Sequence, residues 1–235
     1  MRLTAARVAR AIEDTIVARG WPVGEVFGSE AELLAEYGVG RNVLREAVRI
    51  LETHGVARRR QGPGGGLVVM EPQADVIVES ARLFLNYRHT RLSHLYDTWI
   101  ALEGLALQDL SRSLRPDDLV ALREVIAGTE QWDRKTGALT AGRPNIHLEI
   151  ARLSGNPMLE LFLQTLFVIA TDAGVRRMPM DAAASMWSVD AALVEALATA
   201  DVGLAHLKLR QLIEMLMQYN ELSGVAIGRS ATTPG

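Results

Sequence analysis

Gly40-Arg-Asn-Val-Leu-Arg-Glu-Ala-Val-Arg-Ile-Leu-Glu52 is the stretch that decides the fold of the amino-terminal part of this chain. At 3.6 residues per turn, Arg41, Arg45 and Arg49 fall on one face of a helix. Another face carries an apolar set: Leu44, Ala47, Val48 and Leu51. Duplex DNA suits such a helix, because a major groove admits one α-helix and guanine offers paired acceptors to Arg. A solvated basic face is the alternative that the stripe alone leaves open.

The segment before this stretch predicts a helix-turn-helix. Ser29-Glu-Ala-Glu32 has the pattern of a capping box, in which the Ser hydroxyl and the Glu carboxylate each accept a backbone N–H at a helix start. The short helix that begins there ends at Gly38, and only Gly38 and Val39 separate it from the Arg-rich helix. Such a tight joint is typical of helix-turn-helix units. Apolar residues at helical spacing predict an earlier helix over residues 4–19.

The segment after it predicts a β-hairpin. Two short extended runs, residues 56–61 and 67–70, are joined by the glycine-rich loop 62–66. The first run contains Arg58, Arg59 and Arg60, so the hairpin can lie against phosphates or in a minor groove. Glycine-rich loops that cradle nucleotide phosphates lead into a helix. This loop leads into a strand, which favours the hairpin and completes a winged helix-turn-helix.

The charge distribution favours one focused basic patch. The net charge is -3, yet residues 1–72 hold ten Arg against nine Asp and Glu. Residues 41–60 alone hold six Arg against Glu46 and Glu52. A basic patch on an otherwise acidic chain directs its field at one polyanionic partner rather than at polyanions in general.

Composition narrows the class of protein. Of 235 residues, 49% are hydrophobic and 23% are charged, the usual balance of a globular protein. The chain has no cysteine, which excludes disulfides and thiolate zinc sites and is consistent with a reducing compartment. No apolar run approaches the roughly 18 residues of a membrane span, and the first residues lack a signal-peptide core. We therefore expect a cytoplasmic protein that makes no contact with membranes.

Helical spacing dominates after a short linker at residues 71–74. Breaks rich in Pro, Gly and Asp bound seven expected helices, at about 75–88, 92–113, 116–137, 145–154, 157–177, 181–199 and 202–225. No segment among them reads as a strand. An all-α bundle of this size can enclose a ligand cavity. The expected domains are 1–71, a winged helix-turn-helix; 72–227, an all-α domain; and 228–235, a disordered tail.

Residues 28–70 resemble the DNA-binding domain of the GntR family of bacterial transcription regulators. The likeness rests on the Ser-Glu-x-Glu-Leu start at Ser29, the Gly-Val turn, the Arg-x-x-Leu-Arg-Glu-Ala core from Arg41 and the Gly-x-Gly wing. The resemblance implies DNA contacts from six positions: Arg41, Asn42, Arg45, Arg49, Gln61 and Gly62. Two positions depart from the family pattern. Gly40 stands where Ser or Thr is usual, and Ala31 stands where many members have a basic residue, so the operator or the phosphate contacts should differ.

The helical part resembles the effector-binding domain of the FadR branch of this family. Three phrases carry the likeness: residues 95–103, 145–157 and 193–201. Many members bind a metal through an Asp, a His four residues later and two more His on the last two helices. Here His147 is kept, but Arg143 precedes it by four, and spacing places Asp190 and Leu212 at the other two positions.

One imidazole and one carboxylate beside an Arg make a poor metal site. We therefore expect no metal and no cofactor, with Arg143 pairing with Asp190 or with an anionic ligand. Trp99 stands where the family often has Arg and makes the cavity wall more apolar. Effector-binding residues are thus expected to be Trp99, Arg143, His147 and Asp190, and the ligand an apolar or acyl-type small molecule. Ordinary core packing is the alternative for His147 and Trp99.

The resemblance implies a transcriptional repressor that binds a pseudo-palindromic operator in double-stranded DNA as a homodimer and responds to a small-molecule effector. The alternative within that class is a metal-dependent pocket that senses a carboxylate. From another class, a helical metalloenzyme with a DNA-binding head would use Glu103, His147, Glu149 and Asp190. The chain lacks the paired Glu-x-x-His motifs of such centres, so we expect no enzyme.

Overall fold

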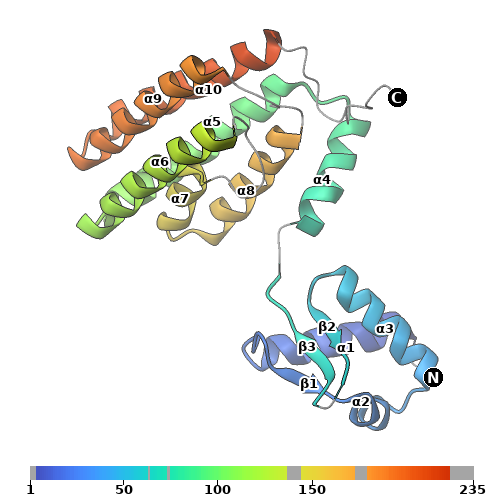
Figure 1. The fold of residues 1–235 in the computed structure, drawn as a ribbon. Coiled ribbons are helices and arrows are strands. Elements are labelled where there is room, and N and C mark those ends of the chain that lie inside the picture. The colour runs from blue at the N-terminus through green and yellow to red at the C-terminus, as the bar shows by residue number, and fades with distance from the viewer. Residues whose placement is uncertain (1–3, 63, 73–74, 137–143, 173–178, 223–235) are drawn as a thin grey trace. The chain divides into compact units, whose positions relative to one another are not determined.

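The structure is a computed structural model of the 235-residue chain, and it describes residues 4–62, 64–72, 75–136, 144–172 and 179–222. The chain divides into two compact units, Met1–Val76 and Ile77–Gly235. Figure 1 shows helices in both units and strands only in the first. The mainly α fold class, with a small β element in the amino-terminal unit, is confirmed. The expected tail at residues 228–235 lies outside the described residues.

The amino-terminal unit is built from three helices and three strands. The helices are α1 (Ala5–Ala18), α2 (Glu30–Tyr37) and α3 (Arg41–Thr53). Their apolar faces meet the inner side of the sheet in one core, where Ile12, Leu51 and Leu67 are almost fully buried. α1 packs along α3, so the helix with the Arg stripe is held by its apolar face.

The sheet has one strand more than the hairpin that the sequence predicted. Its order is β1-β3-β2, with β1 (Val26–Gly28), β2 (Ala57–Arg60) and β3 (Gly66–Val69) all antiparallel to their neighbours. The predicted hairpin is present as β2 and β3, and β1 is a third strand that the sequence did not predict. Strand β1 has only three residues and a register shift, too short to show the alternation by which a strand is recognised.

The second unit contains seven described helices: α4 (Asp75–Tyr87), α5 (Leu92–Ser113), α6 (Pro116–Thr136), α7 (Ile146–Leu153), α8 (Pro157–Asp172), α9 (Met180–Ala198) and α10 (Val202–Leu222). α5 contacts α7, α8 and α10, while α9 contacts α6 and α10. The described part of this unit has no strand, as the sequence predicted.

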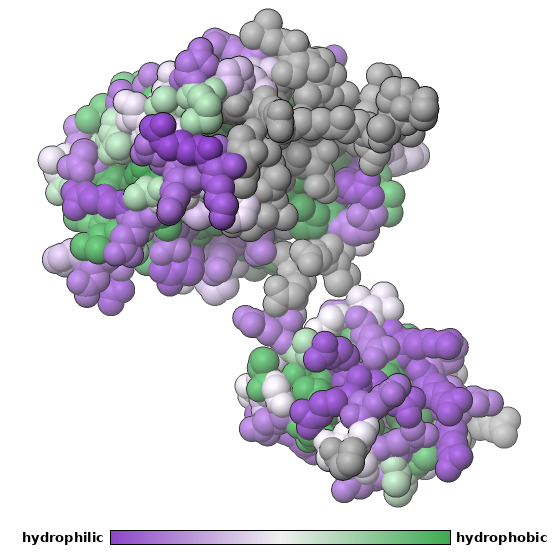
Figure 2. Space-filling view, in the orientation of Figure 1, coloured by the Kyte–Doolittle hydropathy of each residue, from purple (hydrophilic) through white to green (hydrophobic). Residues whose placement is uncertain are grey.

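Hydrophilic side chains cover most of the visible face of the amino-terminal unit in Figure 2. No helix among the described residues is both long enough and apolar enough to cross a membrane.

Candidate nucleic-acid interface and effector site

The Arg-rich helix α3 is fixed by its apolar side and its two ends. Leu44, Ala47 and Leu51 are at most 3% exposed in the core. Gly40 occupies the N-cap position with extended backbone and has no side chain to cap the helix. At the other end, Nδ1 of His54 lies 2.8 Å from Glu13 Oε1 of α1. The stripe of Arg41, Arg45 and Arg49 is consequently left on the exposed face.

The preceding helix α2 starts at the predicted capping box. Glu32 N–H donates to Ser29 Oγ at 3.3 Å, and Ser29 N–H donates to Glu32 Oε2 at 2.8 Å. The Ser29 backbone donor holds the pKa of the Glu32 carboxyl below its ordinary value. Gly38 ends the helix in the left-handed region, with φ of 60°. This turn is short enough to set α2 directly before α3.

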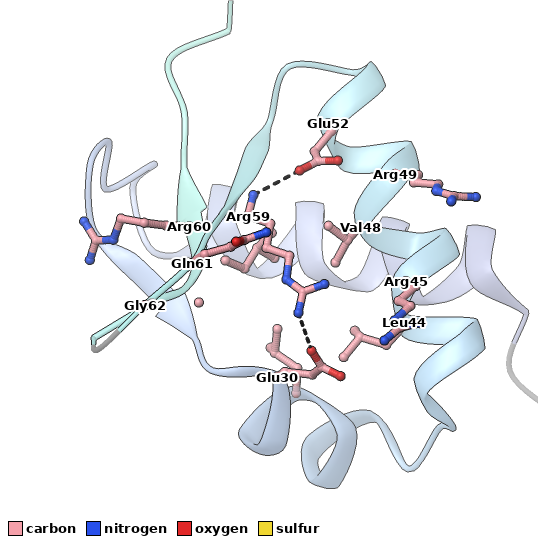
Figure 3. A pocket seen from close by; sticks show the side chains of 14 residues that line it. Glu30, Leu44, Arg45, Val48, Arg49, Glu52, Arg59, Arg60, Gln61 and Gly62 are labelled. Atoms are coloured by element: carbon pink, nitrogen blue, oxygen red, sulfur yellow. Dashed lines mark hydrogen bonds and ion pairs between the residues drawn. The ribbon is translucent and has the colours of Figure 1, made fainter.

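A groove of about 570 Å³ lies between α2, α3 and the wing, which we define as β2, β3 and the loop between them. Figure 3 shows it from close by. Its apolar lining comes from Leu33, Leu44, Val48 and Leu67. Its polar lining includes Glu30, Arg45, Arg49, Glu52, Arg59, Arg60 and Gln61. The groove joins a recognition-type helix to a cationic hairpin, which is the geometry that a nucleic-acid backbone can follow.

Four of the six residues expected to contact DNA line this groove: Arg45, Arg49, Gln61 and Gly62. Arg41 and Asn42 are exposed at the start of α3 and do not line it. Gly62 has φ of 96°, a backbone conformation that glycine adopts without strain.

The arginines of this face differ in their partners. Arg49 donates to Glu46 at 3.0 Å on the same helix, and Nε of Arg41 is 4.0 Å from Glu30. Among the described residues, Arg45 has no carboxylate partner within ion-pair distance. Its guanidinium is therefore the most available of the stripe for a base or a phosphate.

Two acidic residues in the groove were not identified as functional from the sequence. Glu30 accepts a hydrogen bond from the Arg59 side chain, and Glu52 accepts one from the Arg59 backbone. These contacts hold Arg59 in the groove. From the sequence alone, Arg59 was expected to act together with Arg58 and Arg60 as one cationic run. Residue spacing carries no signal for this contact, because Glu30 and Arg59 are 29 positions apart.

In the helical unit, Glu103 joins two of the expected effector residues. Nε1 of Trp99 donates to Glu103 Oε2 at 2.6 Å, and Nδ1 of His147 lies 2.7 Å from Glu103 Oε1. All three side chains are buried, with Glu103 0% exposed. Trp99 also meets the rings of His147 and Phe167 edge-on. From the sequence, Glu103 was a candidate only for a metalloenzyme site. In the structure, its carboxylate connects α5 to α7 through the contact with His147.

The other two expected effector residues are placed differently. Asp190 is on α9 and is 7% exposed, so its carboxylate is buried. Arg143, its expected cationic partner, lies outside the described residues. Within the part of the chain that the structure describes, no three His, Asp or Glu side chains gather in a way that could hold a metal ion. Glu103 already binds an indole and an imidazole, so its chemistry here is that of a buried hydrogen-bond acceptor.

Comparisons with known proteins match both units. Residues 4–67 match the model of the bacterial regulatory proteins of the gntR family, and residues 94–215 match that of the FCD domain. No curated protein matches the chain. A solved structure of Streptococcus agalactiae GntR is 20% identical and has a TM-score of 0.62, over 92% of this chain and 99% of that chain.

Two further solved structures are less similar. One is Lar, which controls expression of the Listeria monocytogenes agr system; it is 17% identical over 94% of this chain and 99% of its own, with a TM-score of 0.45. The other is E. coli McbR/YncC, which is 16% identical over 95% of this chain and 100% of its own, with a TM-score of 0.43.

Proposed function

Because the chain belongs to the GntR family of bacterial transcription regulators and carries an FCD effector domain, we propose that it is a ligand-responsive repressor that binds a pseudo-palindromic operator as a homodimer. The observation that carries the DNA-binding half of this proposal is the groove between α3 and the wing, lined by Arg45, Arg49, Gln61 and Gly62. Its helix is anchored by a buried apolar face, so the exposed Arg side chains are presented by a rigid element.

In this proposal, α3 enters the major groove of duplex DNA. Arg41 and Arg45 contact bases or phosphates near the helix start, with Asn42 beside them, and Arg49 contacts the backbone. The wing places Gln61 and Gly62 on the same DNA segment. Support comes from the exposure of Arg41 and Arg49, whose side chains are 77% and 74% exposed. A guanidinium that is already solvent-exposed can meet guanine or phosphate without prior rearrangement.

One such head covers one half-site, so we infer two copies of the chain per operator. A two-fold symmetric dimer reads two half-sites whose centres are about one helical turn apart, roughly 10 base pairs or a multiple of it. The homodimer that we propose follows from this mode of reading DNA.

The effector site that we propose lies around Trp99, His147 and Asp190, with Arg143 as the residue that would supply a cation. The buried Trp99–Glu103–His147 contacts support a site that is built without a metal. An apolar or acyl-type molecule fits an aromatic wall better than a small carboxylate does. Binding there would regulate DNA affinity if the effector prefers one arrangement of the two heads, with a coupling of about 1–3 kcal/mol.

The test is a salt-titrated DNA-binding assay with the region upstream of the protein's own gene. Specific retention that weakens linearly on a log–log salt plot, by about 0.9 per neutralised phosphate, would support the proposal. Retention that does not depend on salt, or that is the same for an unrelated duplex, would contradict it. Metal analysis of the purified protein then separates the metal-free effector pocket from a metal-dependent carboxylate sensor.

A further inference from the structure

Arg59, in the middle of strand β2, is held by two carboxylates from two different helices. Its Nη2 donates to Glu30 Oε2 at 2.8 Å, and its backbone N–H donates to Glu52 Oε1 at 3.0 Å. Figure 3 shows the Arg59 side chain between α3 and the wing, directed at Glu30. Glu30 is the first residue of α2, and Glu52 is in the last turn of α3. One residue of the wing is thereby tied to both helices of the helix-turn-helix.

The contact between the Arg59 backbone N–H and Glu52 depends on the position of β2 in the sheet. β2 is an edge strand, because the strand order is β1-β3-β2. Alternate N–H groups of an edge strand point away from the sheet and have no ladder partner. Glu52 accepts one of these from Arg59, so the carboxylate fixes the edge of the wing against the end of α3. Opposite Arg59 in the ladder is Leu67, whose side chain lines the groove.

The side-chain contact is poorly suited to stabilising the fold. Glu30 and Arg59 side chains are 36% and 49% exposed, and ion pairs with this exposure contribute little to stability. Both acids also lie in the groove where we propose that DNA binds, and an unpaired carboxylate there would repel phosphates. These two facts favour a role in shaping the groove over a role in holding the domain together.

We propose that Glu30, Arg59 and Glu52 form a clamp that sets the position of the wing relative to α3. Arg59 is then a positioning residue: its guanidinium neutralises Glu30, and Gln61 and Gly62 make the wing's contacts with DNA. This inference rests on the proposed DNA-binding function. It separates the cationic run of β2 into Arg59, which faces the helices, and its neighbours Arg58 and Arg60, which do not take part in the clamp.

The test compares three substitutions that each remove one negative charge from α2 or α3: Glu30→Gln, Glu52→Gln and the control Glu46→Gln. Glu46 pairs with Arg49 within α3 at 3.0 Å and is not among the described residues that line the groove. If only charge mattered, all three would bind operator DNA as tightly as the wild type or more tightly. The clamp predicts that Glu30→Gln and Glu52→Gln lose operator affinity by about tenfold, because the wing must be ordered on binding. Glu46→Gln should lose none.

A second measurement uses the full chain without DNA. Hydrogen exchange at the Arg59 backbone amide should be about tenfold faster in Glu52→Gln, whose amide partner is a weaker acceptor, than in Glu46→Gln. Equal exchange rates in the two variants would overturn the clamp, whether or not the protein binds the DNA tested. A wild-type protein that binds no DNA would instead count against the proposed function, so the two failures can be told apart.

Charge reversal provides a rescue that a merely structural loss would not show. Glu30→Arg and Arg59→Glu singly place like charges together, and each should weaken operator binding. The double variant restores an opposite-charge pair without changing the net charge of the groove. Recovery of operator affinity in the double variant, with unchanged thermal unfolding in all three, is the expected result. No recovery at all would count against the pairing.

Discussion

Oε1 of Glu103 lies 2.7 Å from Nδ1 of His147, and the two side chains are 0% and 8% exposed. The contact joins α5 to α7, and the second oxygen of Glu103 accepts the indole N–H of Trp99. Asn145 stabilises the same region, because its side-chain oxygen accepts a hydrogen bond from the backbone N–H of His147 at 2.8 Å. The Glu103 carboxylate is fully buried, and its contacts are with Trp99 and His147. Loss of either partner should therefore destabilise the fold around the proposed effector site.

Replacing His147 with Ala should therefore destabilise the helical unit. The substitution removes a partner of a fully buried carboxylate, a change that costs about 1–3 kcal/mol when a buried acceptor is left unsatisfied. The measurement is chemical unfolding followed by circular dichroism, with exposed His94→Ala as the control expected to stay within about 0.5 kcal/mol. Equal stability of the two variants would show that Glu103 does not depend on His147.

Arg45→Ala should weaken binding to the operator more than binding to an unrelated duplex. This difference should be larger than for substitutions of Arg41 or Arg49. Arg45 has no carboxylate partner within ion-pair distance among the described residues, so its guanidinium is free to bind DNA. A lost bidentate base contact costs about 1–3 kcal/mol of specific binding. Titration of operator and of an unrelated duplex with this variant measures that loss.

Arg123→Ala is the matched control for Arg45→Ala, since Arg123 is on α6 in the other unit and pairs with Glu195 at 2.9 Å. It should leave both affinity and salt dependence unchanged. If Arg45→Ala behaves like Arg123→Ala, Arg45 is not part of the interface.

Gly40→Ser should restore the N-cap that α3 lacks. The backbone at Gly40 is already extended, with φ of -79° and ψ of 161°, and a Cβ there would meet nothing within 4 Å. Because a Ser cap is better than a Gly cap by only a few tenths of a kcal/mol, the gain in stability should be about that size. The new hydroxyl also stands beside the Arg stripe, so operator affinity should rise. Gly40→Ala introduces no hydroxyl, so it should raise neither the stability nor the operator affinity. A similar effect of both substitutions would contradict the capping explanation.

Local patterns in the sequence were enough to predict most of the secondary structure. The capping box at Ser29 and the Pro and Gly breaks of the helical half mark helix ends by chemistry that acts over three or four residues. α5 begins and ends at the predicted residues, α10 begins at the predicted residue, and α9 differs from prediction by one residue at each end. Helix periodicity predicted the exposed stripe that contains Arg45 and Arg49, whereas Gln61 and Gly62 were implied by the resemblance to the GntR family.

Contacts between distant segments could not be predicted in the same way. Glu30–Arg59 and Glu103–His147 are 29 and 44 positions apart, and no periodicity relates their members. They depend on how α2 meets β2 and how α5 meets α7, which is a property of packing. Strand β1 was missed for a related reason, since its three residues become a strand only by pairing with β3. The partner expected for Asp190, Arg143, lies outside the described residues and stays a prediction.

Gly104→Ala should destabilise the helical unit through the contact between α5 and α10. A Cβ at position 104 would lie 2.5 Å from His206 Nε2 and 3.1 Å from its Cδ2, so the imidazole must move. Overpacking of this kind costs about 1–3 kcal/mol. Unfolding of Gly104→Ala measures the cost, and adding His206→Ala should recover most of it. Gly203→Ala is the control. A Cβ at position 203 would lie 3.5 Å from Asp201 Oδ1, which is an ordinary van der Waals distance, so this variant should not be destabilised by overpacking.

The contribution of Asp118 to stability should depend on pH in the acid range. Arg115 holds the pKa of Asp118 below its ordinary value of 3.8, first by the guanidinium hydrogen bonds and then by its backbone N–H. Folding therefore favours the charged form, and this contribution is complete above the pKa of the unfolded chain. As the pH falls from about 5 through that ordinary value and then through the lowered one, the folded state loses the advantage.

The variant Asp118→Asn tests this dependence, because it removes the ionisation while keeping a side chain of similar size. Unfolding midpoints of wild type and variant should differ at pH 6, and the difference should shrink as the pH falls through the ordinary pKa of 3.8 and then through the lowered one. Asp117→Asn, one position earlier in the first turn of α6, controls for the loss of an acid from the start of the helix. A wild-type advantage over Asp118→Asn that persists undiminished at the lowest pH would mean that the Arg115–Asp118 contact does not depend on the charge of the carboxylate.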